Sequence, residues 1–145
     1  TNQQLVREMM ALGDKIELHT FGKFSPFTAG NVVNHGFETD KRKLMSALNQ
    51  MDALVFSSRV DNYPLILCEA LSIGVPVIAT HSDAAREVLQ KTVSEEEVLQ
   101  LVQLSKPEIA QAIFGTTLAE FSQRSRAAYS GQQMLEEYVN FYQNL

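Results

Sequence analysis

The stretch SSRVDNYPLILCEALSIGVPVIAT, residues 57–80, decides the fold and raises the main question about function. It predicts the end of a strand at 58, a loop over 59–63, a helix over 64–74 with proline first and glycine last, and a buried strand over 75–80. Asp61 stands in the loop, and Glu69 stands among apolar residues of the helix. A carboxylate in such a helix needs an ion-pair or hydrogen-bond partner.

Strand and helix patterns alternate on both sides of this stretch. Helices are expected over 2–13, 41–51 and 84–90, and strands over 15–22, 32–37, 52–58 and 75–80. The strands are apolar without a period of two, which is typical of strands covered on both faces. The sequence therefore predicts an α/β domain with a Rossmann-like parallel sheet and helices on both faces. From about residue 94 only helices are expected, over 94–105, 106–114 and 117–145.

Composition narrows the function classes. The 145 residues fit one domain, and the net charge of −5 disfavours binding to a nucleic-acid backbone. No apolar run approaches the roughly 20 residues of a membrane span. The single cysteine, Cys68, and the lack of a secretory signal predict a cytoplasmic location. We expect a piece of a longer protein, because the sequence starts without Met inside a predicted helix.

Two groups of polar residues give no clear site. The histidines His19, His35 and His81 lie far apart in the sequence without the spacing of metal ligands, so no metal site is predicted. The cluster KRK at 41–43 is interpreted as a solvated first helical turn.

The start of the 64–74 helix is a candidate anion site. Loops at the carboxyl ends of parallel strands lead into helix N-termini, where unpaired N–H groups and the helix dipole favour a phosphate. Pro64 at the first helical position would direct the following amides toward the loop. The alternative is that Asp61 or Asn62 merely caps the helix.

Glu69 has a candidate ligand of its own. No basic residue stands three or four places away, and an ionised carboxylate can accept from the two adjacent hydroxyls of a sugar. Glu69 lies about 7–8 Å along the helix axis from Pro64, roughly the reach from the phosphates of a nucleotide to its ribose. The alternative is a pairing with Arg or Lys from elsewhere in the chain.

These residues resemble a known signature. The stretch is similar to the C-terminal, donor-binding domain of retaining glycosyltransferases with the GT-B fold, the large group 1 family (family 4). That family has two acids separated by seven residues, a loop proline or glycine between them, and then EA followed by G-x-PVIA. The resemblance covers about 35–90 well, and LCEALSIGVPVIATHSDAAREVL is especially similar to bacterial exopolysaccharide enzymes of the colanic-acid type.

The resemblance implies a role for each matching residue. Glu69 would bind the ribose hydroxyls, and Asp61 would face the donor sugar as the catalytic acid residue, in a position where the family usually has Glu. Gly36 and Phe37 would border the base, although Phe37 fits a core position equally well. The donor phosphates would be lined, mainly through backbone N–H groups, by Asn62, Tyr63, Pro64, Leu65 and Ile66.

The implied function is the binding of a nucleotide diphosphate sugar, with UDP or GDP, by one domain over 1–145 whose helical part is 94–145. The full enzyme would transfer the sugar with retention in exopolysaccharide synthesis, without a cofactor or an essential metal. Its N-terminal acceptor domain is absent here, so we expect this piece alone to be inactive. A lipid-linked glycan acceptor would place the full enzyme peripherally at the inner membrane.

The chain departs from the family pattern at several positions, and two rival functions are considered. The paired glycines before the next helix are replaced by Asp83 and Ala84, and the Gly-rich loop around 90–93 is shortened. The family's first strand in this domain, with its Arg and Lys, would lie before residue 1. The rivals are a nucleotide-sugar epimerase of the same architecture and a non-catalytic α/β module such as a receiver domain.

Overall fold

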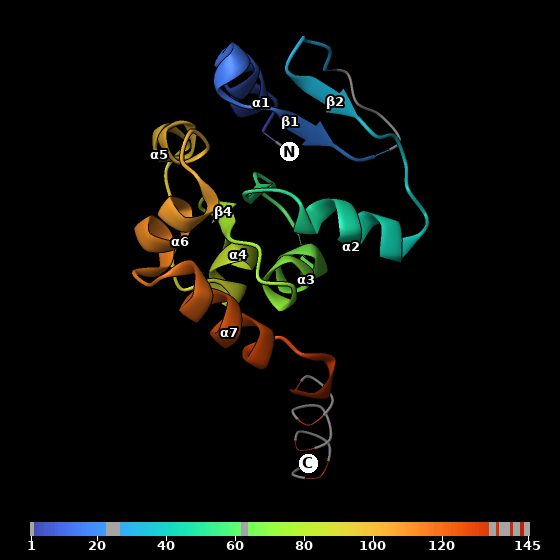
Figure 1. The fold of residues 1–145 in the computed structure, drawn as a ribbon, viewed down its shortest axis with the longest axis vertical. Helices are drawn as coiled ribbons and strands as arrows, with labels where there is room; N and C mark the ends of the chain where they lie inside the picture. The colour runs from blue at the N-terminus through green and yellow to red at the C-terminus, as the bar shows by residue number, and fades with distance from the viewer. Residues whose placement is uncertain are drawn as a thin grey trace.

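Short helices and strands alternate through the first two thirds of the protein (Figure 1). The computed structural model describes residues 2–22, 27–61, 64–133, 136, 140 and 143. The strands are β1 (Leu18–Thr20), β2 (Val32–Asn34), β3 (Leu54–Phe56) and β4 (Val77–Ala79). The helices are α1 (Gln3–Met10), α2 (Lys41–Asn49), α3 (Leu65–Ser72), α4 (Asp83–Val88), α5 (Glu95–Leu101), α6 (Lys106–Phe114) and α7 (Leu118–Ala128), and η1 (Gly13–Lys15) is a 3₁₀ turn.

The strands form two separate parallel pairs. β1 pairs with β2, Leu18 opposite Val32, and β3 pairs with β4, Leu54 opposite Val77. A single parallel bridge joins Thr80 to Val93 beyond β4. The predicted α/β class with parallel strands and helices is confirmed, and among the described residues the strands form two separate pairs.

Local signals place each expected helix start within one residue of the prediction, whereas most helices end two or more residues earlier than expected. The carboxylate of Asp40 accepts from the N–H of Arg42 at the start of α2, and the Ser82 hydroxyl accepts from Ala85 at the start of α4. α3 differs slightly, because Pro64 is its N-cap rather than its first residue. Asp61 therefore does not hold the N-cap position of the alternative interpretation, and Asn62 lies outside the described residues.

The prediction of one helix over 117–145 is wrong. α7 ends at Ala128, with Tyr129 as its C-cap. Residues 131–133 are helical again, and the Ser130 hydroxyl accepts from the N–H of Gln133, as a new N-cap does. Ser130 and Gly131 thus interrupt the helix, because a serine satisfies a helix start better than a helix interior.

Two hydrophobic clusters cover the two faces of the β3–β4 pair. The α3 cluster consists of Leu48, Phe56, Leu67, Ala70, Leu71, Val75, Val77, Ala79, Ala85, Leu89, Ala110 and Phe121. The α1 cluster consists of Leu5, Val6, Met9, Ile78, Val93, Val98, Ile109 and Ile113. Val77 and Ala79 belong to one cluster and Ile78 to the other, because successive side chains of a strand point to opposite faces. Cys68 is buried, as predicted.

None of the described helices combines the length and the apolar character that a membrane crossing would need.

Candidate nucleotide-sugar site

The loop from β3 to α3 carries most of the predicted site. Ser57 is buried where β3 ends, and Pro64 is buried where the loop enters α3. Leu65, the first residue of α3, is 56% exposed, so the first turn of the helix opens to solvent. The N–H groups of Leu65 and Ile66 belong to the first helical turn, whose donors lack intrahelical acceptors. The geometry leaves this helix start accessible to an anion.

The other residues of the predicted loop site are placed unevenly. Asp61 lies exposed in the loop between β3 and α3. Asn62 and Tyr63 fall outside the described residues, so their predicted phosphate contacts stay predictions. Ile66 is half-buried and lines a cavity together with Ser57.

Glu69 differs from its expected environment. Its side chain is 24% exposed, and Lys41 Nζ lies 2.5 Å from Glu69 Oε1. The prediction of a carboxylate enclosed by apolar residues is therefore wrong. The helix is apolar in composition, but only Leu67, Cys68, Ala70 and Leu71 are buried, and Glu69 shares the open face with Leu65 one turn earlier.

In the structure Glu69 pairs with a cation from elsewhere in the chain, as the alternative interpretation predicted. The partner, Lys41, is the first residue of α2, and its side chain is 69% exposed. A pair with so exposed a lysine contributes about 0–1 kcal/mol, because water and salt screen it. Burial thus no longer supports a ribose-binding role for Glu69, and that role rests on the family resemblance and on its position.

The segment from β2 to the start of α2 contains the predicted base region and the partner of Glu69. Gly36 has φ +70°, which a residue with a side chain rarely adopts, and Phe37 follows it with 61% of its surface exposed. The core position considered for Phe37 is therefore wrong. Lys41 lies four residues later, within about 14 Å of extended chain. The structure thus connects the predicted base region to Glu69 through the start of α2.

The contact of Lys41 with Glu69 does not follow from the sequence, in which the KRK cluster was interpreted as a solvated first helical turn. The partners are 28 positions apart, so no helical spacing links them. The available signal was the placement of KRK at the start of a helix that follows a glycine-ended strand, since this brings the helix start to the carboxyl edge of the sheet.

A pair of histidines was missed as well. His19 Nδ1 lies 2.8 Å from His35 Nε2, and His19 Nε2 lies 2.7 Å from a carboxylate oxygen of Glu17. The ring of Phe21 stacks on His35 with centroids 4.4 Å apart. Both strands end before a glycine, and aligning Gly22 with Gly36 would have placed these rings side by side. Among the described residues, no three His, Cys, Asp or Glu side chains gather as metal ligands do.

Comparison with known proteins gives a family match and a near-identical relative. The pattern of the family "Glycosyl transferases group 1" matches residues 3–116. The whole chain aligns, at 97% identity over 149 positions, with the "Putative colanic acid biosynthesis glycosyl transferase WcaC" of Escherichia coli (strain K12). The 149 aligned positions exceed the 145 residues of the chain by four, which leaves four positions without a counterpart here.

The chain spans 37% of the length of this relative, so the comparison covers one part of a longer protein. The family pattern covers α1 through α6, including the loop from β3 to α3 and the Lys41–Glu69 pair. The chain belongs to the group 1 glycosyl transferases.

Proposed function

We propose that this chain binds the nucleotide diphosphate sugar of a retaining glycosyltransferase in bacterial exopolysaccharide synthesis of the colanic-acid type. The observation that carries the proposal is the family match over the β3–α3 loop, where an open helix start and Glu69 lie within one helical turn of each other. The remainder of the longer protein would supply the acceptor domain. A lipid-linked glycan acceptor, a cytoplasmic location and independence from metal stay part of this proposal.

In the proposed complex the diphosphate lies at the start of α3. The N–H groups of Leu65 and Ile66 donate to phosphate oxygens, and the positive end of the helix dipole attracts their charge. These donors also stabilise the nucleoside diphosphate as it leaves the sugar, because they are fixed in place before the charge develops. Asp61 faces the donor sugar from the exposed loop.

The ribose would displace Lys41 from Glu69. Two hydroxyls donate to the carboxylate, and hydrogen bonds to charged groups contribute about 1.5–3 kcal/mol each. The surface ion pair that is lost contributes about 0–1 kcal/mol, so the exchange is favourable. Lys41 then lies free to donate to an oxygen of the bound nucleotide.

A calorimetric titration with UDP and GDP tests the proposal. We expect binding of one of these nucleotides, and a loss of about tenfold or more in affinity for Glu69→Ala. Glu96→Ala, which removes an exposed carboxylate from α5, is the matched control and should bind like the parent chain. Unchanged binding by Glu69→Ala would remove the ribose assignment.

The 2′-deoxynucleotide identifies the group that Glu69 contacts. Removing one hydroxyl should weaken binding to the parent chain and should weaken binding to Glu69→Ala much less, because the two changes remove the same interaction. Additive losses would place the ribose elsewhere. The chain alone should not transfer sugar, and turnover without the rest of the protein would contradict the assignment of this part to donor binding.

A further inference from the structure

The proposed donor would lie across the carboxyl ends of the strands. Its base is expected near Gly36 and Phe37, which follow β2, and its diphosphate is expected at the start of α3, which follows the loop from β3. The sugar is bonded to the diphosphate at the end opposite the nucleoside. It should therefore extend past the start of α3, away from β2, and the strand on that side of β3 is β4.

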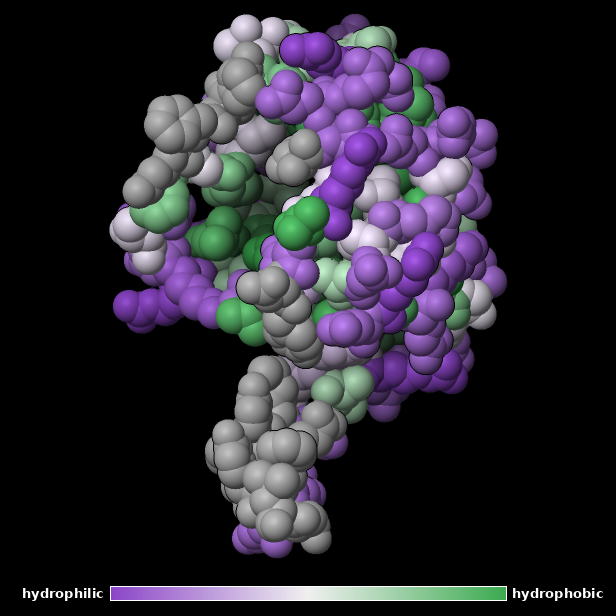
Figure 2. Space-filling model, turned by 180° about the vertical axis from the view of Figure 1, so that it is seen from behind, coloured by the Kyte–Doolittle hydropathy of each residue, from purple (hydrophilic) through white to green (hydrophobic). Residues whose placement is uncertain are grey.

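The two sides of β3 offer a sugar different surroundings. Between β3 and β1 lies a cavity of about 600 Å³ whose walls include Val6, Met9 and Leu48. Figure 2 shows a hollow with hydrophobic walls on the rear face of the molecule. Mostly apolar walls satisfy few sugar hydroxyls, and a hydroxyl buried without a hydrogen bond costs free energy. The carboxyl end of β4, in contrast, leads into the polar run THSD at 80–83.

His81 stands at this end of β4, on the α3 side of the sheet. Successive side chains of β4 alternate between the two clusters, and Ala79 belongs to the α3 cluster, so the alternation directs His81 to the same side. Thr92 agrees with this placement, because its hydroxyl lies 2.5 Å from His81 Nδ1 and its neighbour Val93 belongs to the α1 cluster. The residue is exposed, as a ligand contact requires.

Strand pairing brings His81 next to the loop from β3 to α3. The backbone N–H of Thr80 donates to the carbonyl of Phe56, so the ladder continues past the last residue of β4. The same register places His81 beside Ser58, where the loop begins. Neighbouring strands lie about 4.8 Å apart, and the sugar is bonded directly to the second phosphate. A diphosphate at the start of α3 would thus bring the sugar within reach of His81.

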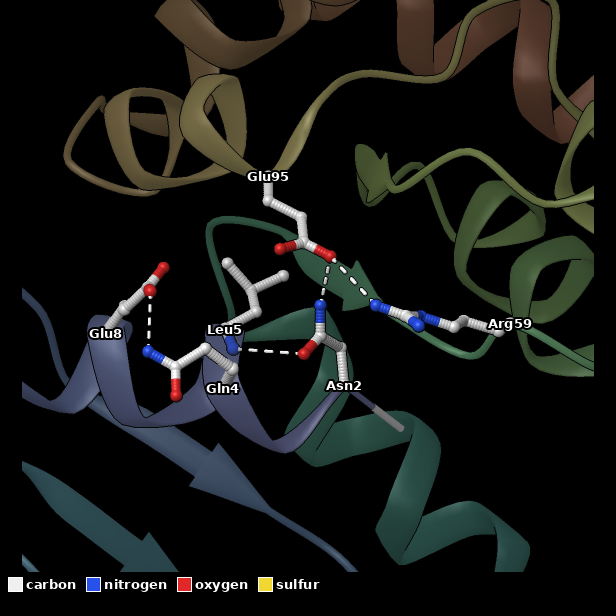
Figure 3. A network of polar contacts seen from close by, with 6 residues as sticks. All are labelled: Asn2, Gln4, Leu5, Glu8, Arg59 and Glu95. Carbon is white, nitrogen blue, oxygen red and sulfur yellow. Dashed lines mark hydrogen bonds and ion pairs between the residues drawn. The ribbon is translucent and has the colours of Figure 1, made fainter.

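An ion pair closes the opposite side of this edge. Arg59, in the loop after β3, lies 3.5 Å from a carboxylate oxygen of Glu95, which also accepts from the side chain of Asn2 (Figure 3). Glu95 follows Val93, which bridges Thr80 on the side of β4 away from β3. The pair therefore spans the end of β4 on the side of α1 and α5, which leaves the α3 side for a ligand.

We propose that His81 is a specificity-determining residue for the donor sugar, an inference that rests on the proposed function. The hydroxyl of Thr92 holds Nδ1, and among the described residues no group bonds to Nε2. Nε2 forms a hydrogen bond with a hydroxyl of the sugar ring, as donor or acceptor according to the tautomer, and Thr92 is the positioning residue that fixes the imidazole. His81 thereby selects among sugars and not among nucleotides.

Calorimetric titrations with UDP, GDP, UDP-glucose, UDP-galactose and GDP-mannose test the proposal. The quantity compared is the sugar increment, which is the affinity for a nucleotide sugar divided by the affinity for the same nucleotide diphosphate. We expect an increment for one of the nucleotide sugars, and His81→Ala should lower it about threefold to tenfold, the effect of one hydrogen bond, with unchanged affinity for the nucleotide diphosphate. Gln90→Ala, an exposed residue shortly before Thr92, is the matched control.

Two amide variants separate the ring nitrogens. The amide of glutamine reaches the position of Nε2, whereas that of asparagine reaches only the position of Nδ1. His81→Gln should therefore keep part of the sugar increment, and His81→Asn should lose it. Thr92→Val, which keeps the shape and removes the hydroxyl, should lower the increment less than His81→Ala does. In the unmodified chain the Nε2 resonance of His81 should shift with the nucleotide sugar and not with the nucleotide diphosphate.

The outcomes distinguish this inference from the proposed function. Equal affinities of the parent chain for nucleotide sugars and nucleotide diphosphates, or an increment that survives His81→Ala, would overturn the role of His81 and leave donor binding intact. Failure of the parent chain to bind any of the five compounds would overturn the proposed function itself.

Discussion

The two strand pairs have the same length and direction, yet they are buried very differently. Val77, Ile78 and Ala79 of β4 are 0–1% exposed, and their side chains enter both clusters. Val33 of β2 is 37% exposed, and from β1 only Leu18 packs against a cluster, the α1 cluster. A parallel strand is stabilised mainly by cover on both faces. The β3–β4 pair is therefore the structural centre, and the β1–β2 pair is a half-covered edge.

Two valine substitutions measure this contrast most directly. Val77→Ala should lower the free energy of unfolding by about 2–3 kcal/mol, because two buried methyl groups are lost and a cavity remains. Val33→Ala removes the same groups from a partly exposed site and should cost less than about 0.5–1 kcal/mol. Urea unfolding followed by circular dichroism gives both values. Equal costs would show that the two pairs are equally important to stability.

Gly74 tests how α3, β4 and the outer helix α7 fit together. It has φ +77°, and a Cβ there would lie 2.9 Å from Ser122 Oγ and 3.2 Å from Arg126 Nε. Gly74→Ala should lower the free energy of unfolding by about 2 kcal/mol through backbone strain and collision. Gly115→Ala is the matched control, because Gly115 has φ +66° with open space around it, and it should cost about 1 kcal/mol. A smaller loss for Gly74→Ala than for Gly115→Ala would contradict close packing of α7 over this turn.

Acid should loosen the helices that cover the β3–β4 pair. The backbone N–H of Ser94 lowers the pKa of Glu97 at the start of α5, and hydroxyl donors at the starts of α6 and α7 lower the pKa values of Glu108 and Glu120. A pKa lowered by folding stabilises the protein above the unfolded value, and this contribution is lost as the pH falls through the lowered folded value. The melting temperature should therefore decrease as the pH is lowered below about 4.5.

The glutamine variants identify the groups responsible. Glu97→Gln should reduce the acid-dependent fall in melting temperature, whereas Glu96→Gln, an exposed neighbour in the same turn, should leave it as in the parent chain. If both variants behave alike, the capping carboxylate is not the group that titrates.

The Lys41–Glu69 pair should have the smallest effect on stability. Lys41→Met keeps the aliphatic stem and removes the charge, and it should lower the free energy of unfolding by less than about 1 kcal/mol. The difference should disappear at about 1 M salt, where exposed charges are screened. Lys43→Met on the same helix serves as the control. A loss that persists at high salt would mean that Lys41 acts through packing.

Local signals in the sequence predict the order and type of the elements. Alternating apolar runs, the caps Asp40 and Ser82 and the glycine after α3 act within a few residues, and the helices that they delimit start within one residue of the expected positions. The sequence also contains a signal for the break at Ser130, because a Ser-Gly pair favours a new helix start over helix continuation.

Pairings between distant residues could not be predicted in the same way. An apolar composition does not reveal which face of α3 stays open, so the exposure of Glu69 was missed. The contact between Lys41 and Glu69 depends on how α2 packs against α3, and the contact between His19 and His35 depends on strand register. The separation into two strand pairs depends on how all the strands assemble. No short stretch of the sequence predicts it.

Cys68 gives the molecule an internal reporter. Its thiol is 5% exposed in the middle of α3, and it is the single cysteine of the chain. An alkylating reagent can reach it only when α3 separates from its neighbours, so the labelling rate measures how often the centre of the domain opens. A second thiol placed on the surface would label at once, which allows one sample to report attachment of a probe and opening of the core on separate timescales.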